Sequence, residues 1–381
     1  MVNITAGLLG VVLIARHGDR LEFFQDPYTY TPTATYITPL GEVEEYISGQ
    51  NLASLYLTPS SPSYINGINT TLADIDQLVF RADASGEGTV ILNSMYALVQ
   101  GMFPPTTYSN VTLSNGTTVT GPLGGYQYIP IQSVENTLDI SLNSFTSCPN
   151  FDNHTAAFYA SPQFQATAME AAPFLMDLAP YLDGRSTNFT NMFNIFDYVN
   201  VQSIHNKTFY DMLPPTFLEQ AYYYANFHEY GVFSDVSPGG IGNIAIQTVL
   251  PSIFTDLQSF ANTSNPLKLA LNGVSYKPFI SLFNITQATV ANPEIAGIVD
   301  YASVVALELS EGADGPTVTM KFRNGTTDME FTTLPMFGNL TSVPLTQFIN
   351  ALAPYAINTT AEWCYACNQT TLNGCAACTL P

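Results

Sequence analysis

The sequence contains little charge, and positive charge is especially scarce. Of its 381 residues, 10% are charged, against about 25% in an ordinary soluble domain. Nine are Lys or Arg and 30 are Asp or Glu, which gives a formal net charge of −21. A chain with so few cations has no basic surface to neutralise phosphates, so nucleic acid is not expected as a partner. The excess of carboxylates suits an acidic environment, in which many of them are partly neutral.

Long hydrophobic runs are also missing. The apolar stretch ITAGLLGVVLIA covers 12 residues, which is too few to cross a bilayer. We therefore expect no transmembrane segment in this chain, and no signal peptide is visible. Apolar residues nevertheless make up 46% of the sequence, which is enough for a large core.

Acceptor sequences for N-linked glycans are frequent and offer a substitute for the missing surface charge. Thirteen Asn-x-Ser/Thr motifs occur, none with Pro in the middle, at Asn3, Asn69, Asn110, Asn115, Asn153, Asn188, Asn206, Asn262, Asn284, Asn324, Asn339, Asn358 and Asn368. So many acceptors in a chain of low charge predict a heavily glycosylated protein that is secreted or held at the cell surface. The alternative is a surface rich in Thr and Asn that carries no sugar.

Cysteine is scarce and clustered. Four of the five cysteines form a C-x2-C-x7-C-x2-C pattern in the C-terminal segment 363–381, and the full set is Cys148, Cys364, Cys367, Cys375 and Cys378. That spacing can bind zinc. The glycosylation pattern indicates an oxidising compartment instead, where disulfides are the better interpretation. We therefore predict disulfides among these five residues, with no metal and no cofactor.

Strand and helix patterns alternate in the first hundred residues. GVVLIA, at 10–15, is typical of a strand buried on both faces of a parallel sheet. Residues 38–57 have helical spacing after a Thr, and residues 76–103 read as a strand, a turn and a helix. This order predicts an α/β fold with a parallel sheet.

The middle of the chain differs from its two ends. Residues 105–250 hold loops, sequons and helical patterns with little strand signal, so we predict a mainly helical cap inserted there. The predicted α/β core comprises 1–104 and 251–381. Within it, alternation on both sides of Asn324-Gly325 predicts a β-hairpin with a two-residue turn.

The scarce cations gather at the end of the first predicted strand. VVLIARHGDR places Arg16, His17 and Arg20 just beyond it, and Arg81 ends the second predicted strand. Ligands of parallel α/β sheets bind beyond the carboxyl ends of strands. Guanidiniums form a planar cradle for phosphate or carboxylate, and a neutral His17 among them is able to attack phosphorus. The alternative is a set of structural arginines paired with Asp19 and Asp83.

These residues carry a resemblance to a known family. The stretches LIARHGDR, VFRADASGEG and YASVVALEL resemble the histidine acid phosphatases, branch 2 of the histidine phosphatase superfamily, in order and spacing over nearly the whole chain. The secreted fungal members are the most similar. The resemblance implies a phosphoglycerate-mutase-like core with a helical cap, and hydrolysis of phosphomonoesters at acid pH. It implies a phosphohistidine on His17, with phosphate bound by Arg16, Arg20 and Arg81.

The sequence departs from the family where the proton donor should be. The usual His-Asp pair is replaced by Ser275 and Tyr276 in NGVSYKPF, and no histidine follows His228. Lys277 offers a replacement phosphate ligand. Loss of a general acid costs about 10²–10⁴-fold in rate, which an activated leaving group tolerates best. The remaining candidates for the acid are Asp19, Asp83, Glu87 and Glu229, the last as a His228-Glu229 pair in the predicted cap.

Two functions therefore remain open. The first is an acid phosphatase, weak because its proton donor is unidentified, that acts on phosphomonoesters. The second is a catalytically degenerate relative that binds a small anionic ligand or serves as a structural or self-assembling extracellular glycoprotein.

Overall fold

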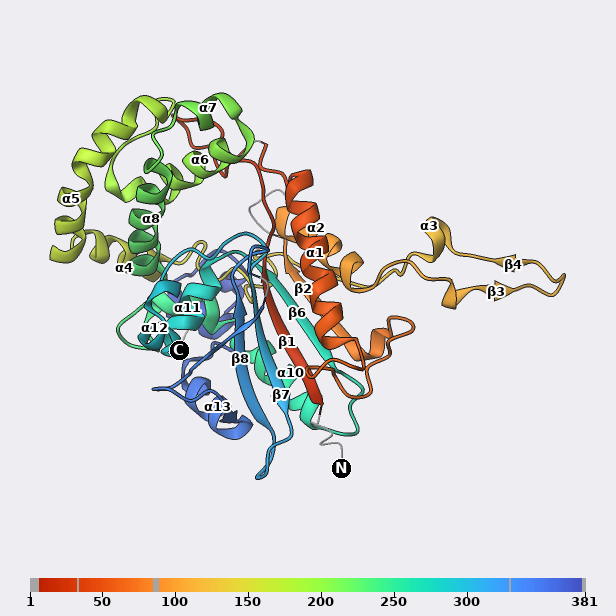
Figure 1. Ribbon diagram of the computed structural model, residues 1–381. Helices are drawn as coiled ribbons and strands as arrows, with labels where there is room; N and C mark the ends of the chain where they lie inside the picture. The colour runs from red at the N-terminus through yellow and green to blue at the C-terminus, as the bar shows by residue number, and fades with distance from the viewer. Residues whose placement is uncertain (1–6, 33, 85–88, 329, 379–381) are drawn as a thin grey trace.

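A single mixed sheet forms the centre of the molecule. The computed structural model describes residues 7–32, 34–84, 89–328 and 330–378 (Figure 1). The strand order is β10-β8-β7-β1-β6-β2-β5, with β9 paired to β8. The parallel half contains β1 (Leu8–Arg16), β6 (Leu269–Val274), β2 (Leu78–Asp83) and β5 (Gln132–Val134). The antiparallel half contains β7 (Val304–Ser310), β8 (Thr317–Arg323), β9 (Thr332–Leu334) and β10 (Val343–Pro344).

Strand β1 is buried on both faces, as its unbroken apolar run predicts. Leu13 belongs to the core cluster formed with helices α1 (Pro39–Tyr56) and α2 (Val90–Met102). Ile14 belongs to the opposite cluster, which contains α10 (Leu250–Ala261), α11 (Lys277–Ile285) and α13 (Leu345–Leu352). Because successive side chains of a strand point to opposite faces, one short segment joins both cores. The α/β fold is thus confirmed, and the predicted parallel pairing holds for β1, β6, β2 and β5.

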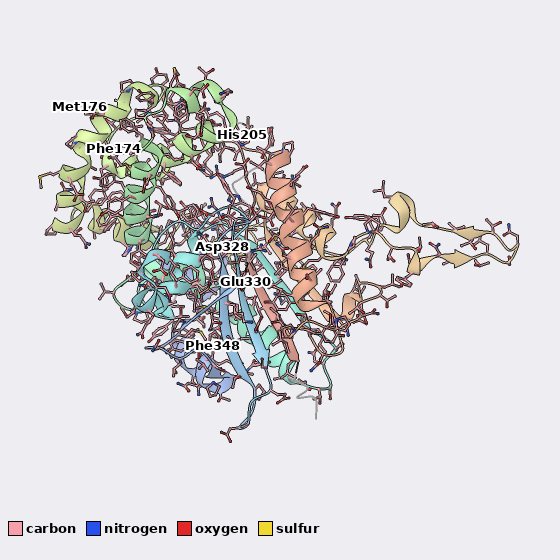
Figure 2. The ribbon with its side chains drawn as sticks, in the orientation of Figure 1. Phe174, Met176, His205, Asp328, Glu330 and Phe348 are labelled. Carbon is pink, nitrogen blue, oxygen red and sulfur yellow. A yellow bond between two sulfur atoms is a disulfide. The ribbon has the colours of Figure 1, made fainter. Side chains whose placement is uncertain are left out.

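A helical cap lies over the carboxyl ends of the parallel strands (Figure 1). It consists of α4 (Pro149–Tyr159), α5 (Pro162–Leu178), α6 (Met192–His205), α7 (Lys207–Met212) and α8 (Phe217–Phe233). The cap has its own apolar cluster, which includes Phe174. Figure 2 shows Phe174 within the cap and His205 on the side of the cap nearest α1. The cap therefore covers the edge of the sheet where the cations were predicted.

The segment 105–250 supplies more than the cap. Its strand β5 pairs with β2 and extends the core sheet. Before β5, the chain forms a projecting arm with a small hairpin of β3 (Val111–Thr112) and β4 (Thr118–Val119), followed by α3 (Pro122–Gly125) (Figure 1). The shorter helices of the remaining chain are α9 (Ile244–Gln247), α12 (Ala288–Ala291) and α14 (Thr360–Cys367).

One disulfide fastens the C-terminal segment to the start of the first cap helix, and a second closes a loop within that segment. Cys148 pairs with Cys367, and Cys364 pairs with Cys375, so the prediction of disulfides is confirmed. Cys378 is a free thiol. Between these bonds Trp363 is fully buried and donates a hydrogen bond to the Ser144 carbonyl at 2.8 Å. Among the helices of the described ranges, none is both long and apolar enough to cross a membrane.

The predicted hairpin forms with a longer loop than expected. Strands β8 and β9 pair antiparallel, with Met320 opposite Leu334, but residues 324–331 separate them. The reason is that the Asn324 side chain is engaged elsewhere. Its Oδ1 accepts hydrogen bonds from the Asp300 amide at 2.8 Å and the Ser303 hydroxyl at 2.9 Å. Asn324 therefore fixes the loop before β7 instead of forming a tight two-residue turn.

Glu45 is a buried acid on α1 with a testable effect on stability. Its side chain is fully buried, and neither carboxyl oxygen has a hydrogen-bond partner among the described residues. Burial, with a smaller effect of Glu44, raises the pKa of Glu45 well above 4.5, although Arg323 and Arg16 oppose this. The folded state therefore keeps a proton that the unfolded chain releases, so Glu45 weakens the fold increasingly as pH rises above about 4.5.

We expect Glu45→Gln to reduce this loss of stability. The reason is that an amide of the same shape has no proton to release, and the maximum effect is about 1.4 kcal/mol per pH unit. Urea unfolding at pH 4 and pH 7 measures it, with exposed Glu42→Gln on the same helix as the control. Equal pH dependence in wild type and Glu45→Gln would contradict the assignment.

Candidate functional site

The end of β1 is held by strands on both sides. The Arg16 amide donates to the Ser303 carbonyl at 2.9 Å, and the His17 amide donates to the Val274 carbonyl at 3.3 Å. The Ala302 amide donates a hydrogen bond to the His17 carbonyl at 3.1 Å. His17 is thus fixed where β1 and β6 end and β7 is about to begin, the expected ligand position of such a sheet.

Glycines let α1 approach this turn closely. A Cβ on Gly18 would lie 2.5 Å from the Gly41 carbonyl oxygen, and one on Gly41 would lie 2.1 Å from the Asp19 carbonyl oxygen. No larger residue fits at either position without moving the backbone. Thr38 caps the helix by accepting from the Gly41 amide at 3.2 Å. The first turn of α1, with Glu44 just behind it, therefore abuts the RHG segment.

His17 is neutral and its tautomer is defined. Nδ1 lies 2.8 Å from the Gly18 carbonyl oxygen, which can only accept, so Nδ1 carries the proton and Nε2 carries the lone pair. Burial, reinforced by the charges of Arg16, Arg20 and Lys277, lowers the pKa of His17 well below 6.5. The imidazole therefore retains its nucleophilic form in mildly acidic solution.

Arg16 and Tyr301 lie over His17. The Arg16 guanidinium carbon is 4.3 Å from the centroid of the Tyr301 ring, and Nη1 donates to the Val299 carbonyl. The Tyr301 ring centroid is 5.6 Å from that of His17. His17 is only 1% exposed, and it is not one of the described residues that line the neighbouring cavity. Access to Nε2 thus requires a neighbouring group to move.

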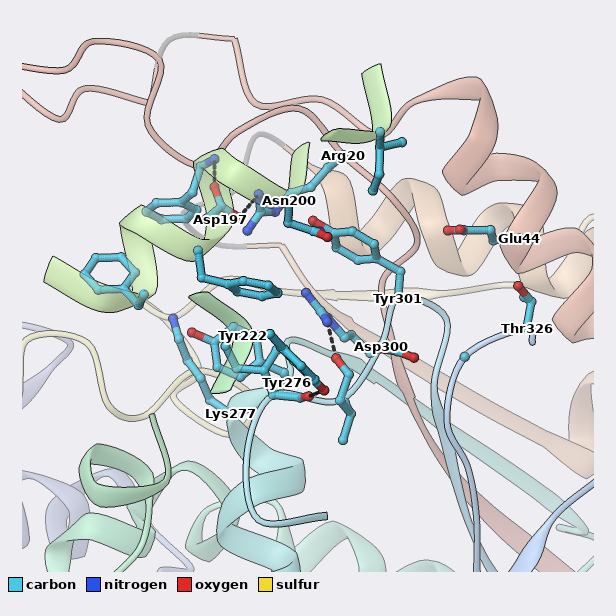
Figure 3. Close-up of a pocket in the computed structure, with 18 of the residues that line it drawn as sticks. Arg20, Glu44, Asp197, Asn200, Tyr222, Tyr276, Lys277, Asp300, Tyr301 and Thr326 are labelled. Carbon is cyan, nitrogen blue, oxygen red and sulfur yellow. Dashed lines mark hydrogen bonds and ion pairs between the residues drawn. The ribbon is translucent and has the colours of Figure 1, made fainter. Parts of the chain in front are cut away.

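A cavity of about 260 Å³ lies between the cap and the core beside Arg16 (Figure 3). Its cations are Arg16, Arg20 and Lys277, and its carboxylates are Glu44, Asp197 and Asp300. Figure 3 shows Lys277 and Glu44 at opposite ends. Six further lining residues are aromatic: Phe23, Phe193, Phe196, Tyr222, Tyr276 and Tyr301. The cavity is therefore charged at several points but balanced in sign.

Two of the three carboxyls protonate readily. Loss of water contact raises the pKa of Glu44 and of Asp300, although Arg16 opposes both shifts. Asp300 is nevertheless an exposed residue. Asp197 instead forms an ion pair with Arg20 at 2.8 Å and accepts from the Phe23 amide at 2.7 Å. Acidification therefore leaves the cavity with net positive charge, which favours an anion.

Tyr276 replaces the expected acid and connects the cavity to the cap. Its hydroxyl donates to Glu229 Oε2 at 2.5 Å, and Glu229 Oε1 lies 2.7 Å from Nδ1 of His228. His228 Nε2 in turn lies 2.9 Å from the Tyr159 hydroxyl. Burial, with the charge of Glu229, raises the pKa of Tyr276 well above 10, so the phenol stays protonated. The His228-Glu229 pair thus lies behind Tyr276 and does not line the cavity in the described structure.

Arg81 does not join the cluster at the end of β1. It lies opposite Asn272, which lies opposite Ile14, so Arg81 is two residues (about 7 Å) short of the level of Arg16. Both guanidinium nitrogens of its fork bind Asp256 on α10, at 2.8 and 3.2 Å. It does not appear among the described lining residues of the cavity. This matches the alternative interpretation of a structural arginine, with Asp256 as the partner.

Of the candidate proton donors predicted from the sequence, those that the structure describes lie in different parts of the chain's fold. Asp19 is fully buried, accepts from the Thr38 hydroxyl and pairs with His205 Nε2 at 2.7 Å, away from the cavity lining that the structure describes. Asp83 is buried and accepts from Asn143 at 3.1 Å. Glu87 lies outside the described residues. Sequence reasoning missed the pocket carboxyls Glu44 and Asp300; the only available signals were the position of Glu44 in the first turns of a helix and of Asp300 just before YAS.

Comparisons with known proteins bear on the fold. No family model matches the sequence, and no curated protein matches it. Among solved structures, the phytase from Citrobacter braakii superposes with a TM-score of 0.61 at 11% identity, covering 94% of this chain and 99% of that one.

Two further solved structures have a similar fold. The phytase from D. castellii has a TM-score of 0.57 at 13% identity, with 96% and 82% of the two chains covered. The multiple inositol polyphosphate phosphatase of Bifidobacterium longum, in complex with inositol hexasulfate, gives 0.51 at 10% identity, with 95% of each covered. The chain thus has the fold of these phosphatases, as its resemblance to the histidine acid phosphatases implies.

The geometry predicts a structural role for Arg81. Arg81→Met leaves the buried Asp256 carboxylate without its partner, so we expect a loss of about 3 kcal/mol in the free energy of unfolding. The double variant Arg81→Met/Asp256→Leu should recover most of the lost free energy of unfolding. Calorimetric titration with inorganic phosphate should show unchanged affinity in the folded double variant but weaker binding in Arg20→Met. A double variant that is stable yet binds phosphate poorly would place Arg81 in the site after all.

Proposed function

We propose that this chain, which has the fold of the phytases, binds phosphomonoesters between its core and cap and slowly hydrolyses those with activated leaving groups. The observation that supports this most is the state of His17. A neutral imidazole with its lone pair on Nε2 lies beside the guanidinium of Arg16, next to a cavity that also contains Arg20. Cations hold the anion while an uncharged nucleophile attacks phosphorus.

The proposed reaction has two steps on His17. Nε2 attacks phosphorus, the bond from phosphorus to the ester oxygen breaks, and the leaving oxygen takes a proton to become an alcohol. Water then attacks the phosphohistidine, which releases inorganic phosphate and restores the lone pair on Nε2. A group that covers His17 has to move before the first step, because this side chain is only 1% exposed. This requirement is one reason to expect slow turnover.

We assign the proton donor of the first step to Asp300. This exposed residue lines the cavity, its pKa is raised, and its carboxyl has no hydrogen bond or ion pair with other described residues. Glu44, the other carboxyl with a raised pKa, accepts from the Asp19 amide at 2.8 Å and is less available. A carboxyl that holds its proton to a higher pH donates over a wider acidic range.

The charge balance favours small monoesters over polyanions. The phytase from Hafnia alvei has been solved with tartrate and with myo-inositol hexakis sulphate, the second of which carries six anionic groups. In this chain three cations of the cavity face three carboxyls, and about 260 Å³ is below the usual 300–1,000 Å³ of ligand pockets. We therefore propose a substrate with one phosphate group.

A second candidate function is binding without turnover. It is favoured by the 1% exposure of His17 and by the phenol of Tyr276 where the acid was expected. In either case we propose an extracellular glycoprotein, because thirteen sequons accompany two disulfides. Self-association stays a proposal without further support.

We expect the purified protein to hydrolyse an aryl phosphate at pH 4–5, and His17→Ala to lower kcat at least about 100-fold, since it removes the nucleophile. His154→Ala, a histidine of α4 outside the described cavity lining, is the matched control. Wild type and His17→Ala with equal rates would reject the enzymatic function and leave the binding function.

Asp300→Asn tests the donor separately. Because the amide cannot donate an acidic proton, we expect kcat to fall about 100-fold on an alkyl phosphate and far less on an aryl phosphate with a good leaving group. The falling limb of the pH profile should disappear, since wild type loses activity as pH rises through the raised pKa of Asp300. An unchanged pH profile in Asp300→Asn would exclude it as the acid.

A further inference from the structure

A second cavity of about 350 Å³ adjoins the first. The two share the side chains of Phe193, Tyr276 and Lys277, so they meet at the start of α11 below the cap. We call the second cavity the aromatic chamber; its apolar walls include Phe151 and Phe233. None of the functions argued above uses this chamber.

Four of the polar groups on the wall of the aromatic chamber bind one another. Glu229 accepts from Tyr276 at 2.5 Å and lies 2.7 Å from His228 Nδ1, while Tyr159 meets His228 Nε2 at 2.9 Å. Tyr159, His228, Glu229 and Tyr276 all line the chamber. These four groups already satisfy each other, and the rest of the wall is mainly rings and methyl groups, with Asp152 and Thr155 as further polar groups on α4.

Lys277 marks the boundary between the two cavities. Its ammonium lies 4.5 Å from the centroid of the Phe145 ring and 5.7 Å from that of Phe233, and it makes no hydrogen bond or ion pair with any described residue. Its charge also lowers the pKa of His17, which places it within electrostatic reach of the proposed nucleophile. A cation held only by ring faces is available to an incoming anion.

We propose that the aromatic chamber binds the organic group of the phosphoester while Arg16, Arg20 and Lys277 hold its phosphate, an inference that rests on the proposed function. The chamber selects monoesters of aryl or other apolar alcohols, because its rings gain by burying apolar surface and the four mutually bonded polar groups on its wall are already satisfied. Polyols lose hydration there without gaining partners. Lys277 sits at the junction, where the phosphate meets the organic group.

Two phosphonates that cannot be hydrolysed test this independently of turnover. Phenylphosphonate and methylphosphonate share a head group and differ only in the organic group. By calorimetry at pH 5 we expect phenylphosphonate to bind wild type about tenfold more tightly, since burial of a ring is worth more than 1.4 kcal/mol. Myo-inositol hexakis sulphate should bind more weakly than phenylphosphonate.

Variants test whether the preference for phenylphosphonate arises in the aromatic chamber. Thr155→Trp fills the aromatic chamber from α4, and we expect it to remove the tenfold preference while methylphosphonate affinity stays the same. Ala157→Trp, exposed on the same helix and outside the chamber lining that the structure describes, is the matched control, and Asn153→Gln controls for the sequon that Thr155→Trp also removes. Lys277→Met should weaken both phosphonates alike, whereas Lys207→Met on the cap surface should weaken neither.

The outcomes test the aromatic chamber separately from the proposed function. Equal binding of the two phosphonates, tighter binding of the hexakis sulphate, or an intact preference in Thr155→Trp overturns the aromatic chamber as a binding site, even if His17-dependent hydrolysis is observed. Absence of binding by both phosphonates overturns the phosphate pocket and the chamber with it. Phenylphosphonate preference without any hydrolysis supports the chamber and rejects only the catalytic part of the proposed function.

Discussion

The position of the Arg16 guanidinium is the constraint on which the rest of the site depends. Strand β1 is bonded on both sides, so it delivers Arg16 to the point where the sheet meets the cap. There the guanidinium donates to Val299 and stacks on Tyr301 at 4.3 Å, a contact worth about 0.5–2 kcal/mol. The same charge lowers the pKa of His17 and limits the rise in the pKa of Asp300. Nucleophile and candidate acid thus both depend on one arginine.

Around this arginine the proposed site combines cations that suit an anion with a tyrosine at the place where the family resemblance led us to expect an acid. Tyr276, at the expected place of an aspartate, is turned toward Glu229 of α8 and keeps its proton. This interaction ties the cap to the core, and it removes Glu229 from the proposed chemistry. Carboxyls at the cavity wall then gain importance, because partial loss of water raises the pKa of Glu44 and Asp300 toward the acidic range in which a donor works.

Much of this architecture could be predicted from local sequence patterns, whereas the contacts between distant segments could not. The apolar run before Arg16 specifies a strand buried on both faces, and Thr38 followed by helical spacing specifies α1. The partner of Arg81 lies 175 residues away on α10, and nothing near Arg81 indicates that its side chain points to that face. Glu229 reaches Tyr276 across 47 residues only because α8 packs against α11. Such pairings depend on packing, which no motif encodes.

The central claim is that His17 accepts a phosphoryl group in a pocket still organised by Arg16. The most direct measurement is mass spectrometry of the protein quenched in alkali within its first turnovers of an aryl phosphate, since phosphohistidine survives alkali and not acid. The account predicts one added phosphoryl group on the peptide containing His17, absent in His17→Ala. A protein that binds phenylphosphonate but never shows this adduct during observed hydrolysis would contradict it.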